Sequence, residues 1–192
     1  MAGLSLSKGN NLSLTKTSPG LTVATVGLGW DPRTTAGEAF DLDASALLVG
    51  ADGKVRSDAD FIFYNQPKSA DGSVEHKGDN RTGQGDGDDE QIVIDLQTLP
   101  ADVERVVVVV SIDQGEARRQ NFGQVRSAYS RVLDQEGAEI VRFDLSEDAA
   151  PETAMIFSEI YRSGAEWKFR AVGQGYQSGL AGVATDFGVQ LG

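Results

Sequence analysis

The sequence predicts a mainly β protein: a β-sandwich of two antiparallel sheets with one or two peripheral helices, formed as a single domain over residues 1–192. Short runs that alternate polar and apolar residues recur along the chain, and turn signals such as Asp-Gly separate them at a spacing of roughly ten residues. No long linker or shift in composition divides the chain, and its length suffices for one sizeable core.

The first half of the chain contains several strand patterns. Apolar residues alternate from Leu4 to Leu14 around turn residues 9–11, which predicts an N-terminal β-hairpin. Further strands are expected at residues 21–28, 40–49 and 60–65.

The second half contains a run of five valines within residues 103–112, which is typical of a strand buried on both faces. Two segments favour helices: residues 114–125, rich in Ala, Arg and Gln, and residues 151–162, where a proline suits the first turn and an apolar stripe follows. The other strands are expected at residues 91–96, 129–134, 139–145 and 167–172.

Composition excludes several classes of function. Twenty-nine acidic residues against 17 basic ones give a net charge of −12, which argues against binding nucleic acid and against adsorption to an anionic membrane. The absence of cysteine excludes disulfides, thiolate nucleophiles and sulfur-ligated metals. His76 is the one histidine, so a multi-histidine metal site is excluded as well.

The chain also lacks the patterns of export and membrane insertion. Its N-terminus has no long apolar run of the signal-peptide kind, and no apolar stretch approaches the roughly 20 residues of a membrane span. We therefore expect a cytoplasmic protein with no direct membrane insertion.

The segment GDNRTGQGDGDDE, residues 78–90, combines four glycines with five carboxylates. A phosphate-binding loop is excluded, because no Lys-Ser/Thr follows and the surroundings are anionic. An EF-hand is excluded too. Asp79 and Glu90 stand at its first and twelfth positions, but Arg81 and Gln84 occupy positions three and six, where a ligand and a glycine are needed.

A calcium loop of another kind fits the segment better, because calcium accepts six to eight oxygens at flexible angles. Glycines allow a tight backbone that presents carbonyl oxygens, and clustered carboxylates repel one another without a cation. The expected ligands within the segment are Asp79, Asn80, Gly83, Gly85, Asp88, Asp89 and Glu90. Carboxylates of neighbouring segments could complete a site for two Ca²⁺ ions, namely Asp31, Asp41, Asp43 and Asp60.

Motifs across nearly the whole chain closely resemble the TerD family of tellurium-resistance and stress-response proteins. They are GLGWD (27–31), FDLDASA (40–46), DADFIFYN (58–65), the acidic segment, ARRQNFGQV (117–125) and WKFRAVGQGY (167–176). The resemblance implies a cytoplasmic calcium-binding β-sandwich whose acidic loops carry the ligands. It also implies partners, which are TerD-family paralogues and a membrane-bound protein of the resistance system.

The expected function is that of a calcium-binding sensor or scaffold in tellurite and general stress resistance, not that of an enzyme. Two methionines and one histidine make a poor soft-ligand site for tellurium. One alternative is a calcium-dependent membrane or carbohydrate binder, which would use Trp30 as an exposed aromatic, although a core role for Trp30 is favoured. The other is a metal-assisted hydrolase with His76 as its base, although a surface histidine beside a turn is favoured.

Overall fold

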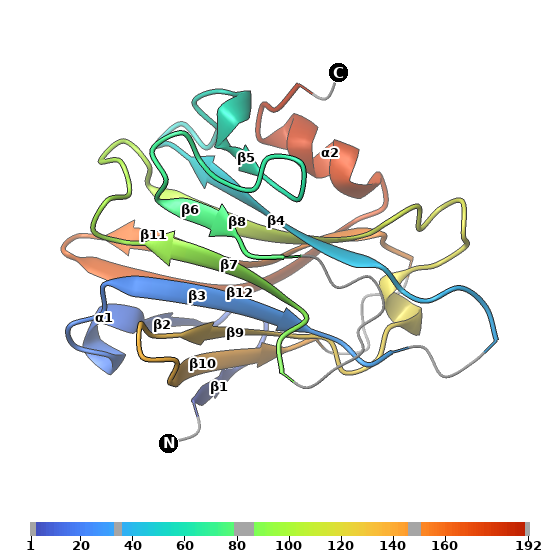
Figure 1. Cartoon of the computed structure of the whole chain (residues 1–192), viewed down its shortest axis with the longest axis horizontal. Coiled ribbons are helices and arrows are strands. Elements are labelled where there is room, and N and C mark those ends of the chain that lie inside the picture. The colour runs from blue at the N-terminus through green and yellow to red at the C-terminus, as the bar shows by residue number, and fades with distance from the viewer. Residues whose placement is uncertain (1–2, 33–35, 79–86, 146–150, 191–192) are drawn as a thin grey trace.

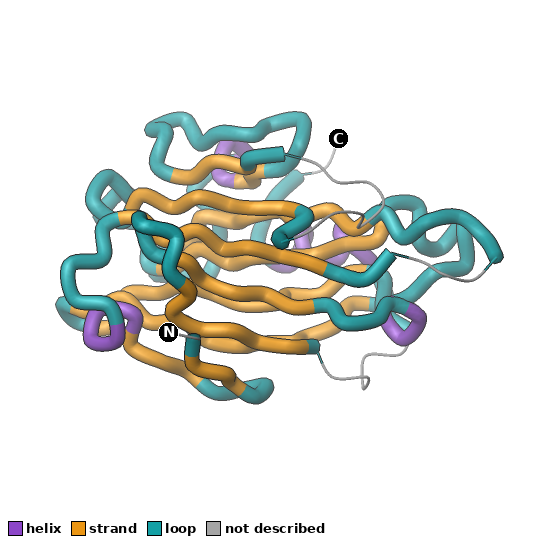
Figure 2. The backbone as a smooth tube through the Cα atoms, turned by 60° about the horizontal axis from the view of Figure 1, so that its bottom comes forward, coloured by secondary structure: helices purple, strands orange, loops and turns teal. Residues whose placement is uncertain are grey.

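The computed structural model describes residues 3–32, 36–78, 87–145 and 151–190. Their strands form two six-stranded sheets that pack face to face, so the predicted β-sandwich is confirmed (Figures 1 and 2). Among the described residues, neighbouring strands pair antiparallel except for the first strand, which runs parallel to its partner.

We name the two layers sheet A and sheet B. Sheet A has the order β1-β10-β9-β3-β7-β6, with the bounds Leu4–Leu6, Glu139–Asp144, Tyr129–Leu133, Val23–Gly29, Glu90–Asp95 and Val74–His76. Sheet B has the order β2-β12-β11-β8-β4-β5, with the bounds Asn11–Ser13, Glu166–Tyr176, Ala154–Ser163, Arg105–Ile112, Leu42–Val49 and Phe61–Ile62.

The main core lies between the sheets, and a second apolar cluster lies on the outer face of sheet B. In β4 and β8 the even-numbered apolar residues belong to the main core, whereas Leu47, Val107 and Val109 belong to the outer cluster. Side chains alternate across a strand, so the valine run is buried on both faces, as predicted.

Helices are few and short. The α-helices are α1, Leu14–Thr17, and α2, Gly179–Asp186; the 3₁₀ helices are η1, Asp58–Asp60, and η2, Phe122–Gln124. Helix α2, which the sequence analysis did not anticipate, packs Val183 and Ala184 into the outer cluster and so covers part of sheet B (Figure 1).

The predicted helix at 151–162 is wrong, because most of it forms the strand β11. This strand lies between β8 and β12 and is buried on both faces, and its register shifts by a β-bulge between Ile156 and Ser158. A strand buried on both sides is apolar at nearly every position, so its sequence also satisfies a helical stripe.

The predicted helix at 114–125 is also wrong. The segment is a series of turns that ends in η2, and Gln114 and Arg119 have positive φ angles of 49° and 56°. Such left-handed residues interrupt a right-handed helix.

The predicted N-terminal hairpin is not formed, since β1 joins β10 in sheet A while β2 joins β12 in sheet B. The chain thus crosses between the layers at the turn. The strand expected at 60–65 shortens to the two residues of β5, preceded by η1.

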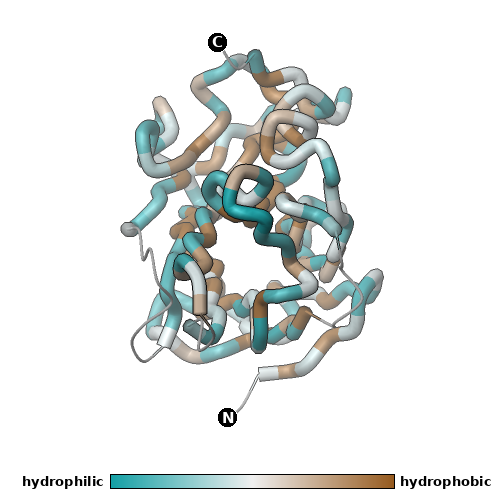
Figure 3. The backbone as a smooth tube through the Cα atoms, turned by 90° about the vertical axis from the view of Figure 1, so that its right-hand side faces the viewer, coloured by the Kyte–Doolittle hydropathy of each residue, from teal (hydrophilic) through white to brown (hydrophobic). Residues whose placement is uncertain are grey.

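One end of the sandwich gathers the loops that carry most of the described carboxylates singled out in the sequence analysis. There β3 ends beside the start of β7, with Leu28 opposite Glu90, and β4 begins beside the end of β8, with Leu42 opposite Ile112. Figure 3 looks onto this loop end. Within the described parts of the chain, no helix is both long and apolar enough to cross a membrane.

Candidate functional site

The loop end brings together most of the described carboxylates that the sequence singled out. Asp31 follows the end of β3, and Asp88 and Asp89 lead into β7, whose first residue is Glu90. Asp41 and Asp43 lie at the start of β4. Antiparallel pairing places these strand ends at the same end of the sandwich, so segments far apart in sequence converge there.

Asp89 is held to the end of β3 by two hydrogen bonds. Its backbone N–H donates to the Leu28 carbonyl oxygen at 2.8 Å, and its Oδ2 accepts from the Trp30 backbone N–H at 2.9 Å. Burial raises the pKa of Asp89; the Trp30 N–H opposes that shift, and the charges of Asp88 and Asp31 add to it. Three negative groups therefore interact here, and a bound cation would lower their mutual repulsion.

Asp88 has a different environment, because its side chain is only 1% exposed and is fully engaged with protein groups. Its Oδ1 accepts from Arg131 Nε at 2.8 Å and from the Tyr129 hydroxyl at 2.9 Å, and its Oδ2 accepts from Gln91 Nε2 at 3.1 Å. This carboxylate holds the entrance of β7 to the outer face of sheet A.

Glu90 connects the two sheets. It is 2% exposed, and its Oε2 accepts from the backbone N–H of Ala44 in the facing sheet. Ala44 lies in β4 beyond the residues that pair with β5, so this bond satisfies an N–H on the open edge of the strand.

His76 is buried beside Glu90, so the expectation of a surface histidine is wrong. Its Nε2 lies 3.4 Å from Glu90 Oε2, and its Nδ1 accepts from the Gly78 backbone N–H at 3.3 Å. This pattern assigns the proton to Nε2. Because both ring nitrogens are engaged inside the protein, the geometry does not favour His76 as a general base.

Asp41 and Asp43 take different positions at the start of β4. Asp41 is buried, and its backbone carbonyl accepts from the Asp113 N–H at 2.8 Å. Asp43 lies opposite Ser111 of β8 and lines a cavity on the outer face of sheet B.

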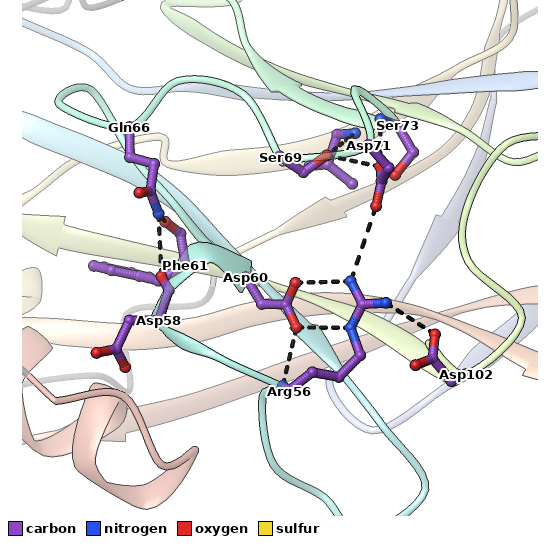
Figure 4. Close-up of polar contacts among 10 residues, drawn as sticks. Arg56, Asp58, Asp60, Phe61, Gln66, Ser69, Asp71, Ser73 and Asp102 are labelled. Carbon is purple, nitrogen blue, oxygen red and sulfur yellow. Dashed lines mark hydrogen bonds and ion pairs between the residues drawn. The ribbon is translucent and has the colours of Figure 1, made fainter.

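Asp60 is not brought to the loop end. It is buried in η1 and accepts from Arg56 through Oδ1 and Oδ2 at 2.8 and 2.9 Å (Figure 4). The following residue, Phe61, pairs with Leu47, five positions along β4 from Leu42, which corresponds to about 17 Å. Arg56 also pairs with Asp102 at 2.9 Å and with Asp71 at 3.9 Å, so Asp60 takes part in an ion-pair network that joins three segments of the chain.

Four predicted ligands, Asp79, Asn80, Gly83 and Gly85, lie outside the described residues. Within the described ranges, no group of three or more His, Cys, Asp or Glu side chains is arranged to hold a metal ion. The described carboxylates that best fit a hard cation are Asp31 and Asp89, whose oxygens suit Ca²⁺ chemically.

The sequence analysis missed the residues that support the site. Gly27 and Gly29 lie on the outer face of β3, where a β-carbon would meet Asp88 and the Tyr129 ring respectively at under 3.0 Å. The two glycines at alternate positions of this strand could have indicated these contacts, since a glycine within a strand often marks a place where another group packs closely against the backbone. Trp30 is 5% exposed, which confirms its favoured core role.

Comparison with known proteins identifies the family. Residues 1–187 match the TerD domain. The chain belongs to the TerD family. Tellurium resistance protein TerD of Alcaligenes sp is 58% identical to this TerD-family chain, over 97% of each chain.

Other TerD-family relatives extend to stress proteins. General stress protein 16U of Bacillus subtilis (strain 168) is 51% identical over 98% of this chain and 99% of its own. A solved homologue of telluride resistance protein (TerD) from Streptomyces coelicolor A3(2) superposes with a TM-score of 0.71 at 27% identity. It covers 86% of this chain and 96% of its own. The family is thus one of tellurium and general stress resistance.

Proposed function

We propose that this protein is a calcium-binding sensor or scaffold of a tellurium and stress resistance system. The observation that carries the proposal is the convergence of Asp31, Asp88 and Asp89 at the loop end, where burial and like charges raise the pKa of Asp89. An arrangement that makes a carboxylate costly to ionise favours a cation nearby.

The donor chemistry supports calcium over softer ions. The side chains that converge at the loop end are carboxylates, which are hard oxygen ligands, and the chain has no cysteine to supply a soft sulfur ligand. In this proposal Asp31 and Asp89 bind the ion, while Asp88 positions the segment through Arg131 and Tyr129. The remaining predicted ligands, Asp79, Asn80, Gly83, Gly85, Asp41, Asp43 and Glu90, stay predictions of the sequence.

Binding, not catalysis, is the proposed activity. Bound calcium would neutralise the loop end and thereby fix the surface that other proteins contact. The proposed partners are TerD-family paralogues and a membrane-bound protein of the same system, and the proposed location is the cytoplasm. The alternative of a sugar binder finds little support, because Trp30 is buried and is not available as an exposed aromatic platform.

Matched charge-removing variants test the proposal. Calcium affinity is measured by isothermal titration for the parent, Asp31→Asn, Asp89→Asn and the control Glu136→Gln, an exposed residue of the 134–138 turn. We expect Asp31→Asn and Asp89→Asn to weaken binding at least about tenfold, a loss of about 1.4 kcal/mol. Equal affinities in all four proteins would refute this site.

Partner binding is tested separately with purified paralogues, with calcium and with chelator. Capture that requires calcium and is lost in Asp89→Asn supports the scaffold role, whereas capture that is indifferent to calcium contradicts it.

A further inference from the structure

A cavity of about 650 Å³ opens on the outer face of sheet B, at the loop end. It lies between the end of β8, the loop that follows and the first turn of α2. The residues that matter for its chemistry are Asp43, Tyr64, Ser111, Asp113 and Glu116. Its volume falls within the range of about 300–1,000 Å³ that small-molecule sites occupy.

The floor of the cavity is a pair of facing strand residues, Asp43 of β4 and Ser111 of β8. Both continue the odd-numbered series that faces away from the main core, so their side chains point to the cavity side of sheet B. Ser111 is only 7% exposed and lines the cavity. A hydroxyl can both donate and accept, so this side chain could hydrogen-bond a ligand in the cavity.

The walls make the cavity anionic. Asp113 and Glu116 add two carboxylates to that of Asp43. The guanidinium of Arg118 lies 3.7 Å from Asp113 Oδ2 and is shared with Glu38, to which its Nε donates at 2.9 Å. The arginine therefore offsets only part of the negative charge.

The rim of the cavity carries an exposed aromatic ring. Tyr64 is 53% exposed, although its ring packs edge-on against Phe63 at 5.5 Å, which in turn stacks on Phe61 at 4.8 Å. The packing orients the ring, while much of its surface remains open. An aromatic face beside carboxylates attracts organic cations through cation–π and Coulomb interactions.

We propose that this cavity binds a small organic cation with an ammonium or guanidinium group. The carboxylates of Asp113 and Glu116 neutralise the charge of the cation. The Ser111 hydroxyl accepts a hydrogen bond from one of its N–H groups, and the Tyr64 ring packs against it. A metal ion fits less well, because the cavity is much larger than an ion. The four residues assigned to the organic cation are not among the predicted calcium ligands, so this inference does not rest on the calcium proposal.

Agmatine, which carries both groups, is the probe. Isothermal titration is performed at saturating calcium and again with chelator, on the parent and on Tyr64→Ala, Ser111→Ala and Glu116→Gln. Glu136→Gln is the control that removes an equal charge outside the cavity. We expect saturable one-site binding that each cavity variant weakens by about tenfold, and that the control leaves unchanged.

A second arm distinguishes a free metabolite from the side chain of a partner protein, through the capped residue N-acetyl-arginine amide. Tighter binding of agmatine indicates a free amine, and tighter binding of the capped arginine indicates a partner side chain; either supports the cavity. Two results overturn the proposal: no saturable binding of either probe at millimolar concentration, or equal weakening by the control. Tyr64 is exposed, so Tyr64→Ala keeps the test valid even if Ser111→Ala fails to fold.

Discussion

The carboxylate of Asp88 lies directly against the main chain of Gly27 on the outer face of sheet A. A β-carbon at position 27 would meet both carboxylate oxygens at under 3.0 Å. The glycine in β3 thus makes room for the aspartate that anchors the start of β7. It links the GLGWD motif to the acidic segment that follows some 60 residues later in the chain.

Replacing Gly27 by alanine should displace Asp88 from Arg131 and Tyr129. We expect a loss of about 1–3 kcal/mol in the free energy of unfolding, measured by urea denaturation. Gly50→Ala is the control, since a β-carbon there meets its nearest neighbour at 3.4 Å, and it should change stability little. A stability loss no larger than that of the control would contradict the close approach.

Removing the guanidinium partner of Asp88 should also destabilise the fold. Arg131→Met leaves a carboxylate that is 1% exposed without its charged partner, so we expect a cost of about 1–3 kcal/mol. Lys16→Met is the control, because its ion pair with Glu166 is exposed to solvent and should contribute little to stability. Addition of Asp88→Asn to Arg131→Met should restore part of the loss, and a double variant that is less stable still would argue against the pair.

The Tyr129 hydroxyl should titrate at unusually high pH. Burial, and then the hydrogen bond it donates to Asp88, raises the pKa of Tyr129 to about 12. The unfolded value is about 10, so this stabilisation is fully present below pH 10 and is lost as the pH rises towards 12. Phenolate absorbance of the parent, compared with Tyr129→Phe, should isolate one tyrosine that ionises late; an ordinary titration of all four tyrosines would contradict this.

Asp60 should matter for stability and not for calcium. Asp60→Asn weakens its paired contact with Arg56, so we expect a lower urea midpoint with unchanged calcium affinity and stoichiometry. The measurement is denaturation together with calcium titration on the same preparation. Loss of a calcium ion in this variant would return Asp60 to the ligand set.

The sequence predicts much of this fold because its strands carry their own pattern. The valine run of β8 and the alternation at the start of β4 each indicate a strand without reference to the rest of the chain. The acidic segment likewise stands out by composition alone. These are local properties, and local properties are what a single sequence displays.

The errors arise where tertiary structure decides. The sequence of β11 resembles an amphipathic helix because burial on both faces removes the alternation typical of a strand. The placement of β1 and β2 in different sheets depends on their distant partners, β10 and β12. At the site, no local pattern indicates that Asp88 forms an ion pair with Arg131. Nor does any local pattern indicate that Asp60 lies away from the loop end and pairs with Arg56. Such assignments depend on contacts between residues far apart in sequence.

The central claim, that calcium binds this chain, is tested most directly by titrating calcium into the chelator-treated protein while following heat and melting temperature. The account predicts saturable binding of about two ions and a higher melting temperature. A free calcium concentration 100 times the dissociation constant of one site would add about 2.7 kcal/mol of stability. No binding heat and no change in melting temperature at millimolar calcium would contradict it.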